Sequence, residues 1–536
     1  MMVRLIILFL ALSALLRAER PNILFILTDD QRQDSLPIYG NSFVKTPHID
    51  QFAAESVVFE HASVTSAICT PSRASYFSGQ YERRHAINFN SGTAMSGSAW
   101  ENCYPSQLRK AGYFTGYIGK NHLPVGPQGY QTGLMDGSFD FWYAGHGHIR
   151  FYPKNHHEIF AHAKAHTQLE IINEGTQNFL SGEEFLEGAQ TFLKSRDSSK
   201  PFALSLCLNL PHGAGTSTMK MKPSDDELYR TAYRDRLDEI PLPKTYLAKA
   251  EIKTPKLPAD LLHTQFRQRG YDYVDAPETL RERIVRQYQT ITGIDRLIGN
   301  IRAKLEELGV AENTLIVYSS DHGLLLGDHG LGGKSLNYEP CLAVPLIIHD
   351  PRIRKGRREK ALVQSIDIAP TLLDYAGAPI PSSMQGKSLK PLLEEKVIQI
   401  RQFAFAENLW SNYFGNPRIE SLRGPRFKYI RYFKNGRERW SKATKKTLYK
   451  VTPAMAAHYA SSLNASIMGE QPVYEELFDL EVDPLETTNL INEPSLAVTA
   501  TLFRQQCQAH VTQARGDWRI PVSTLPIPAD ADAKAK

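Results

Sequence analysis

The chain has 536 residues, of which 42% are hydrophobic and 22% are charged. This composition is that of a globular protein with a sizeable core, and the length allows one large domain with a smaller one attached. The 62 basic residues exceed the 57 acidic ones only slightly, which gives a net charge of +5. So small a surplus argues against a nucleic-acid-binding protein, which needs a concentrated basic face.

Residues 1–18 have the pattern of a secretory signal peptide. Arg4 precedes an uncharged apolar run over residues 5–16, and the small residue Ala18 stands before a polar stretch. The run is shorter than the roughly 20 apolar residues that span a bilayer. We therefore expect an exported protein, periplasmic or secreted, without a stable membrane anchor.

Five apolar runs of strand length follow, separated by helical or irregular stretches. They cover residues 20–30, 112–120, 201–212, 313–323 and 344–350. Residues 280–309 carry apolar side chains at helical spacing and end on Gly309. Strands that alternate with helices predict an α/β fold with a large, mostly parallel sheet flanked by helices.

The pattern changes near residue 396, where short strand-like runs separated by turns begin. A helical pattern follows them at residues 495–514. This order predicts a smaller C-terminal antiparallel sheet packed by a helix. We assign residues 19–395 to the main α/β domain, 396–515 to a C-terminal α+β subdomain and 516–536 to an irregular tail.

The five cysteines are odd in number and widely scattered. They are Cys69, Cys103, Cys207, Cys341 and Cys507. Their spacing fits neither a disulfide scaffold nor a Cys-x-x-Cys zinc site, and whether the last four form disulfides stays open. Cys69 stands beside Pro71 and Arg73 in AICTPSRASYFSG, residues 67–79. These residues alone leave four roles for Cys69: half of a disulfide, a thiolate nucleophile, a core residue or a substrate for modification.

Charged side chains and histidines follow four of the apolar runs. They are Asp29 and Asp30, Lys120 and His122, His212, and Asp321 with His322. The carboxyl ends of strands form the ligand-binding edge of an open α/β sheet. Neighbouring carboxylates there repel each other unless a cation lies between them, and an oxygen-rich site suits a hard ion such as calcium. Taken singly, each aspartate also fits a helix cap and each histidine a hydrogen-bonded structural role.

These runs resemble the type I, formylglycine-dependent sulfatases of the alkaline phosphatase-like superfamily. CTPSRASYFSG resembles the family signature, PNILFILTDD its first strand and GYIGKNH its lysine-histidine loop. SDHGLLLGDHGLGGK resembles its second metal strand with the sulfate-binding lysine, and SIDIAPTLLDYAG and ELFDLEVDPLETTNL resemble its later motifs. The resemblance spans nearly the whole mature chain and implies a sulfuric ester hydrolase with that fold, its catalytic domain in residues 19–395.

The resemblance implies that Cys69 is oxidised after translation to formylglycine (3-oxoalanine). A formylglycine-generating enzyme or an anaerobic maturase would read Pro71 and Arg73 in the unfolded chain. The aldehyde hydrates to a geminal diol, of which one hydroxyl attacks sulfur and the other later expels sulfate. A serine could attack, but it has no second hydroxyl to release the sulfate.

The resemblance also implies one calcium ion per chain, held by Asp29, Asp30, Asp321, His322 and the modified Cys69. The ion would orient the diol and the sulfate oxygens and neutralise their charge. Many family members have asparagine at the position of His322. Calcium prefers oxygen donors, so the histidine nitrogen is the departure from the pattern in this set.

Five further side chains receive roles from the matching motifs. Arg73 would stabilise the hydrated residue and the anion. Lys120 and Lys334 would contact sulfate oxygens and stabilise the charge of the transition state. His122 would take the proton of the second hydroxyl, and His212 would protonate the leaving alkoxide.

The motifs look like those of bacterial exported carbohydrate sulfatases, which implies a sulfated polysaccharide or oligosaccharide as substrate. Residues 139–157 interleave aromatic side chains with His146, His148 and Arg150. They fit a platform for sugar rings, and equally a surface loop with a small aromatic cluster. Residues 215–278 are rich in charge and proline and indicate an insertion near the cleft. Its lysines Lys220, Lys222 and Lys244 could flank the substrate.

Three alternatives remain open. The first is an arylsulfatase acting on small substrates, and the second is a phosphonate or phosphodiester hydrolase of the same superfamily. Lys120, His122 and Lys334 together favour sulfate over phosphorus esters. The third is a non-catalytic glycan-binding protein that keeps the fold.

Overall fold

The central strand of the protein is β1 (Asn22–Asp29), in which all eight residues are buried. Its side chains alternate between two cores, with Phe25 and Leu27 in one and Leu24 and Ile26 in the other. Burial on both faces explains why this strand is a continuous apolar run. The computed structural model describes residues 20–89, 91–127, 129, 133–146, 188–212, 227–262, 271–353, 355–410, 415–436, 453–517 and 519. The predicted signal peptide therefore lies outside the described residues.

In the described part of the chain, eight strands form the main sheet, in the order β11-β2-β10-β7-β1-β6-β4-β5. Besides β1, they are β2 (Val57–Phe59), β4 (Phe114–Asn121), β5 (Phe141–His146), β6 (Phe202–Pro211), β7 (Thr314–Ser320), β10 (Leu346–His349) and β11 (Arg357–Glu359). All neighbours are parallel except the two pairs that β10 makes with β7 and β2. The prediction of a large, mostly parallel sheet is confirmed. Because β10 runs the other way, Asp350 lies at the edge opposite to Asp29.

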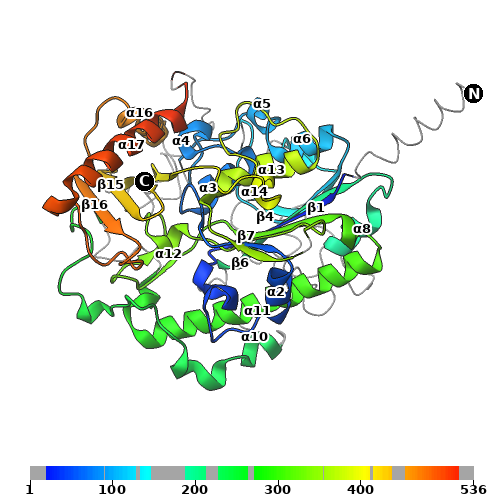
Figure 1. The fold of residues 1–536 in the computed structure, drawn as a ribbon, viewed down its shortest axis with the longest axis horizontal. Coiled ribbons are helices and arrows are strands. Elements are labelled where there is room, and N and C mark those ends of the chain that lie inside the picture. Colours follow the sequence, from blue (N-terminus) through cyan, green and yellow to red (C-terminus); the bar gives the residue numbers. More distant parts are fainter. Residues whose placement is uncertain are drawn as a thin grey trace, which may run out of the picture.

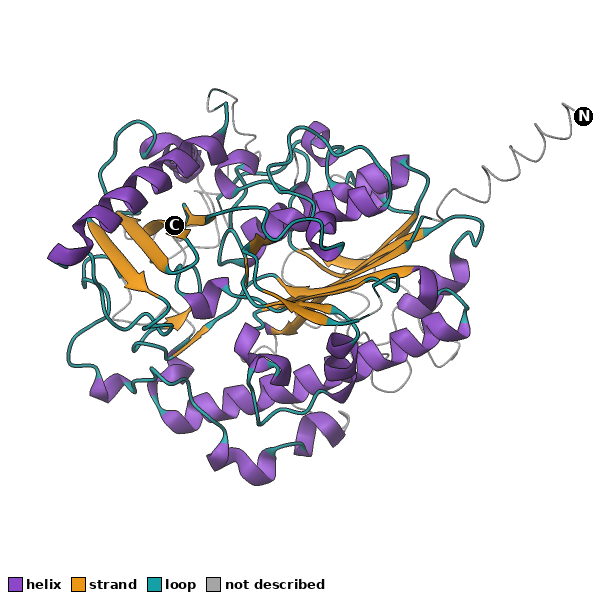
Figure 2. Ribbon diagram, in the orientation of Figure 1, coloured by secondary structure: helices purple, strands orange, loops and turns teal. Residues whose placement is uncertain are grey.

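Helices cover both faces of this sheet, as Figure 1 and Figure 2 show. One layer contains α3 (Cys69–Ser78), α6 (Tyr104–Lys110) and α13 (Ile368–Tyr375), and the other contains α2 (Pro47–Ala54) and α11 (Pro277–Glu307). Helix α11 was expected over residues 280–309. It begins with Pro277 at its first position, where a missing N–H costs nothing. Its apolar stripe, including Ile284 and Ile291, packs against the side of β1 that carries Leu24.

The described residues of the C-terminal part form a second, smaller sheet of four antiparallel strands. They are β13 (Ala404–Asn408), β14 (Arg418–Arg423), β15 (Phe427–Phe433) and β16 (Tyr474–Asp479), in that order. Helix α17 (Ala497–Arg515) packs on it through Phe503, Cys507 and Val511, which meet Phe405 and Leu422. The predicted C-terminal antiparallel sheet with its helix is thus confirmed.

Shorter elements complete the described chain. The helices are α4 (Glu82–His85), α5 (Gly97–Trp100), α8 (Ala189–Ser195), α10 (Glu227–Thr231), α12 (Glu339–Leu342), α14 (Lys390–Leu393) and α16 (Pro453–Ala465). Two small sheets pair β3 (Ala62–Ser63) with β12 (Val363–Gln364) and β8 (Leu325–Leu326) with β9 (Gly332–Gly333). All five cysteines fall within the described ranges, and each is a buried free thiol. Among the helices described, none has both the length and the apolar character to cross a bilayer.

Candidate active site

The carboxyl ends of four parallel strands bring the candidate residues to one edge of the sheet. Asp29 ends β1 and lies opposite Pro211 of β6, directly before His212. Asp321 follows β7, and its N–H donates to the carbonyl oxygen of Thr28 over 3.0 Å. Residues far apart in the sequence therefore meet because the strands run side by side in one direction.

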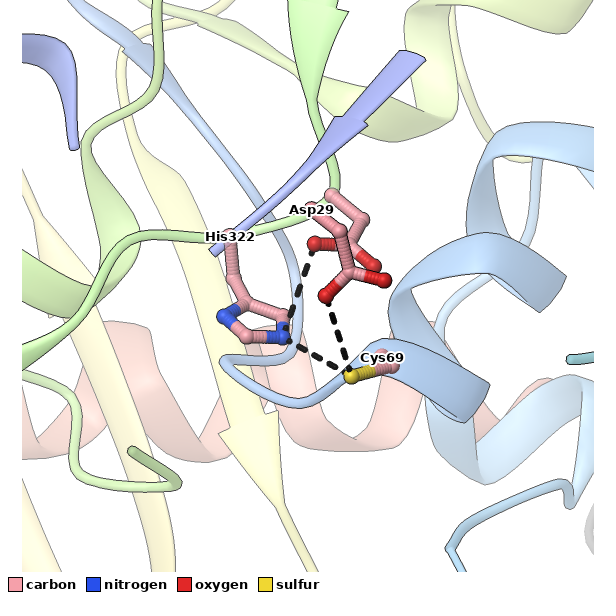
Figure 3. Close-up of side chains that lie close together, drawn as sticks. Asp29, Cys69 and His322 are labelled. Carbon is pink, nitrogen blue, oxygen red and sulfur yellow. Dashed lines mark hydrogen bonds and ion pairs between the residues drawn. The ribbon is translucent and has the colours of Figure 1, made fainter. Parts of the chain in front are cut away.

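Cys69 is the first residue of α3, a helix in which all ten residues are buried. Its Sγ lies 3.6 Å from Asp29 Oδ1 and 3.3 Å from both His322 Nε2 and Lys334 Nζ. Figure 3 shows the side chains of Asp29, Cys69 and His322 pointing toward one another. The amino end of a helix carries partial positive charge, so an anion held beside Cys69 would be stabilised by it.

The contact of Nδ1 with a backbone carbonyl fixes the orientation of the His322 ring, whose Nε2 lies beside Cys69. Nδ1 lies 2.8 Å from the carbonyl oxygen of Gly323, which can only accept a hydrogen bond, so Nδ1 carries the proton. In the neutral ring the lone pair of Nε2 then faces Cys69 and the nearby Asp321, whose Oδ1 is 3.5 Å away. A ring held in this way is suited to ligate a cation through Nε2.

Asp30 has a backbone conformation that suits few residues other than glycine, with a φ of 60°. Its Oδ1 accepts a hydrogen bond from Lys334 Nζ over 2.8 Å. Its Oδ2 is buried and receives no hydrogen bond from the described part of the chain, and His212 Nε2 lies 3.5 Å from it. An orphaned, buried carboxylate oxygen is costly unless a cation satisfies it.

Among the described residues, two overlapping groups of side chains could hold a metal ion. One contains Asp29, Cys69, Asp321 and His322, and the other contains Asp29, Asp30 and His212. Within each group the ligand atoms lie within 4.8 Å of one another. The three carboxylates supply the oxygen donors that calcium prefers, and Asp30 Oδ2 accepts no hydrogen bond from the described residues.

Arg73 bridges two of these carboxylates. Its Nε donates to Asp321 over 2.9 Å and its Nη2 to Asp29 over 3.0 Å, while Nη1 and Nη2 also donate to the carbonyl oxygens of Lys120 and Leu208. The side chain is 1% exposed. Since most of its donors are engaged by protein atoms, its geometry favours positioning of the carboxylates over direct contact with a substrate.

Two buried lysines neutralise the remaining negative charge. Lys120 forms an ion pair with Asp29, and Lys334 forms one with Asp30. Burial alone would raise the pKa of Asp29, but the charges of Lys120, His212 and Arg73 hold that pKa well below its usual range. Burial raises the pKa of Asp30, because its neighbours compensate it less completely.

Two further histidines of the site, His122 and His212, are also buried. His122 is 6% exposed and lies edge-on to Phe89, with ring centroids 5.6 Å apart. Burial, and after it the charge of Lys334, lowers the pKa of His212 well below its usual range. His122 directly follows β4 and His212 directly follows β6, so both lie at the edge of the sheet that carries Asp29 and Asp321.

The sequence of residues 21–378 matches the sulfatase family, and that match covers more than half of the chain. The chain belongs to the sulfatase family. Residues 327–446 also match the C-terminal region of N-sulphoglucosamine sulphohydrolase. The predicted family and enzyme class are thus confirmed: the protein is a sulfuric ester hydrolase.

This sulfatase is 29% identical to an N-acetylglucosamine-6-O-sulfatase of Bacteroides thetaiotaomicron, over 70% of this chain and 72% of the relative. It is 28% identical to an arylsulfatase of Clostridium perfringens, over 88% of this chain and 90% of the relative. A solved structure of a protein in complex with its substrate D-glucosamine-2-N,6-O-disulfate matches with a TM-score of 0.64 at 23% identity, covering 94% of this chain and 99% of that one. At that identity the structural likeness shows the alkaline phosphatase-like fold alone.

The aromatic stretch at residues 139–157 is described only as far as residue 146. Phe139 and Tyr143 are buried, and Trp142 stacks on Tyr117 with ring centroids 5.0 Å apart. These rings belong to the packed core of the sulfatase and are not a free platform for sugar. The side chain of His146 and the whole of His148, Arg150, Lys220 and Lys222 lie outside the described residues, whereas Lys244 is exposed.

Sequence reasoning missed the residues that support Lys334. Asn416 donates a hydrogen bond from Nδ2 to the carbonyl oxygen of Lys334 over 2.9 Å, and it comes from the C-terminal part of the chain. No motif marks Asn416, because its partner is 82 residues away and the bond is to backbone. Only the folded arrangement of the two sheets shows this contact.

Proposed function

We propose that this sulfatase hydrolyses sulfate esters on a sulfated polysaccharide or oligosaccharide, with formylglycine made from Cys69 and one bound calcium ion. The observation that carries the proposal is the position of Cys69. Its Sγ lies at the amino end of α3 within 3.6 Å of Asp29, His322 and Lys334. A residue placed between a carboxylate, an imidazole and an ammonium group is suited to react with an anionic ester.

The modified residue would supply a geminal diol, with one hydroxyl to attack sulfur and one to release sulfate afterwards. Helix α3 fixes its backbone, because every residue of that helix is buried. Arg73, one turn further along the same helix, holds the carboxylates of Asp29 and Asp321 beside it. The chain thus preorganises the nucleophile, which removes orientational entropy from the reaction.

Calcium would be held by Asp29, Asp30 and Asp321, with His322 and the modified Cys69 completing the set. The donor chemistry fits, since three buried carboxylates converge and Asp30 Oδ2 lacks a hydrogen bond from the described residues. The ion would supply charge neutralisation for the sulfate and for the nucleophile. We assign this ligand set as a proposal.

The remaining side chains would move protons and balance charge. Lys334 Nζ lies 3.3 Å from Cys69 Sγ, so it would face a sulfate oxygen. Lys120 would act from the end of β4, where it pairs with Asp29. His122 would accept the proton of the second hydroxyl. His212 would donate a proton to the leaving alkoxide, and the negative charge of a bound sulfate ester would favour its protonated form.

The substrate class rests on the relatives. One is an N-acetylglucosamine-6-O-sulfatase, and a structural neighbour was solved with a disulfated glucosamine. A buried general acid such as His212 also suits sugar alcohols, which are poor leaving groups. The similarity to an arylsulfatase favours a second candidate, small aryl sulfates.

The experiment compares kcat/KM on one preparation for N-acetylglucosamine 6-sulfate, a nitrophenyl sulfate and a matched nitrophenyl phosphate diester. We expect both sulfates to be turned over in preference to the phosphate diester, and the sugar sulfate to bind more tightly. Preference for the phosphate diester would contradict sulfate as the natural ester. Activity on the aryl sulfate alone would leave the sulfatase reaction but remove the carbohydrate from the proposal.

Maturation and export complete the proposal. The signal-like pattern of residues 1–18 would send the chain out of the cytoplasm to the periplasm or the medium. Because Cys69 is 1% exposed in the fold, a formylglycine-generating enzyme or anaerobic maturase would have to act before folding. A sulfated glycan would be the substrate met outside the cell.

A further inference from the structure

Residues 334–339 connect the active site to the C-terminal sheet. At one end, Lys334 Nζ reaches Asp30 and Cys69. The next residue, Ser335, has a φ of 69° and donates its N–H to the carbonyl oxygen of Ala67 over 2.8 Å, two residues before Cys69. The segment therefore turns sharply beside the reactive residue.

The rest of the segment is attached to the C-terminal sheet. Asn337 Nδ2 donates to the carbonyl oxygen of Ala406 over 3.1 Å and to Ser421 Oγ over 2.9 Å. Tyr338 and Glu339 continue the attachment. Tyr338 OH donates to Glu476 over 2.8 Å, and Glu339 accepts from Lys428 over 2.9 Å. Strands β13, β14, β15 and β16 thus each provide a partner for this segment.

Asn416 contacts the backbone of Lys334 itself. Its Nδ2 donates to the carbonyl oxygen of Lys334 over 2.9 Å, and Asn435 Nδ2 in turn donates to the carbonyl oxygen of Asn416 over 2.6 Å. Asn416 is fully buried, and its Oδ1 accepts no hydrogen bond from the described part of the chain. Asn416 therefore links the start of β14 and the end of β15 to the backbone of Lys334.

We propose that Asn416 is a positioning residue for Lys334, so that the C-terminal sheet sets the place of a cation in the sulfate-binding site. The hydrogen bond fixes the peptide plane between Lys334 and Ser335. The orientation of this plane sets the position of the Lys334 Cα, from which the side chain extends. A shift of about 1 Å at a reacting group can cost about 100-fold in rate. The inference rests on the proposed function, since it takes Lys334 to contact the sulfate group.

Two substitutions separate positioning from packing. Asn416→Ala removes the donor and the volume, whereas Asn416→Asp keeps the volume but turns an acceptor toward the Lys334 carbonyl oxygen. The matched control is Gln364→Ala. Gln364 is buried and donates from Nε2 to the carbonyl oxygen of Phe405 in β13 over 2.8 Å, which joins the same two parts of the chain away from Lys334.

The measurements are kcat/KM for a sugar sulfate and for an aryl sulfate, the inhibition constant of inorganic sulfate, and the unfolding midpoint. Because Lys334 would touch the sulfate that both substrates share, both Asn416 variants should lose about 10-fold to 100-fold in kcat/KM on both substrates. The inhibition constant of inorganic sulfate should rise in parallel. Gln364→Ala should lower the unfolding midpoint at least as much as the Asn416 variants do. It should keep kcat/KM on both substrates and the inhibition constant of inorganic sulfate.

Three results would overturn the inference. Full activity of Asn416→Asp would mean that the side chain only fills space. A loss confined to the sugar sulfate would mean that Asn416 contacts the sugar. An equal loss in Gln364→Ala would mean that any weakening of this interface disturbs the site. Lys334→Ala tests the proposed function separately. If this variant stays active on both sulfates, the role proposed for Lys334 is wrong. If it is inactive while the Asn416 variants stay active, only the inference about Asn416 is wrong.

Discussion

At the scale of single residues, the site is a set of buried charges that compensate one another. The carboxylates of Asp29, Asp30 and Asp321 face the cations of Arg73, Lys120 and Lys334. Removing one member of a buried pair leaves its partner uncompensated, which typically costs about 3–5 kcal/mol. A loss of activity at these positions therefore has to be measured together with the free energy of unfolding.

His212 offers a test that avoids this difficulty, because its proposed role depends on the leaving group. His212→Ala should lower kcat/KM for a sugar sulfate by about 100-fold or more, the range of general acid catalysis. A nitrophenyl sulfate should lose far less, since its phenoxide leaves without a proton. The measurement is one pair of kcat/KM values for the variant and for the unsubstituted enzyme.

His122→Ala is the comparison for this experiment. His122 would act after the leaving group has departed, so its loss should harm both substrates alike. If His212→Ala also harmed both equally, the assignment of His212 as the general acid would have to be given up.

At the scale of elements, helix α4 attaches the main domain to the C-terminal sheet through one arginine. Arg83 Nε donates to Glu407 over 2.6 Å and its Nη2 to Glu420 over 2.6 Å, and all three side chains are at most 1% exposed. Nη1 also donates to the carbonyl oxygen of Leu463 over 2.9 Å. This short helix thus contacts β13, β14 and α16 with one guanidinium group.

Arg83→Met should therefore destabilise the protein strongly. It leaves Glu407 buried without its cation, whereas Glu420 keeps its ion pair with Arg431. The expected loss is about 3–5 kcal/mol in the free energy of unfolding. Denaturant titration measures this loss. As a control, Lys110→Met removes the exposed ion pair with Glu101, in which both side chains are 55% exposed, and should change stability by about 1 kcal/mol or less. Similar losses in both variants would contradict the importance given to the Arg83 contacts.

At the scale of the whole molecule, the strands that carry the site could be read from the sequence because they are buried on both faces. The apolar run before Asp29 and Asp30 is continuous, as expected for a strand buried on both faces, and it forms β1. The direction of β10 could not be read, since an apolar run of four residues looks the same in either direction. The contact of Asn416 with Lys334 could not be read either, because it depends on how the second sheet meets the first.

Removal of calcium is the prediction that involves the whole fold. A ligand that binds only the folded state stabilises it by about 2.7 kcal/mol at 100 times its dissociation constant. Chelation should therefore lower both the unfolding midpoint and the activity, and added calcium should restore both. A chelated preparation that keeps full activity and contains no metal by elemental analysis would contradict the calcium proposal.

We propose that the sulfatase works through formylglycine at position 69. The most direct measurement is the mass of the tryptic peptide covering residues 46–73, which contains Cys69 and ends at Arg73. We expect the mass of the aldehyde or its hydrate, with sulfatase activity proportional to the modified fraction and almost absent in Cys69→Ser. A fully active preparation in which this peptide carries only the free thiol would contradict the account.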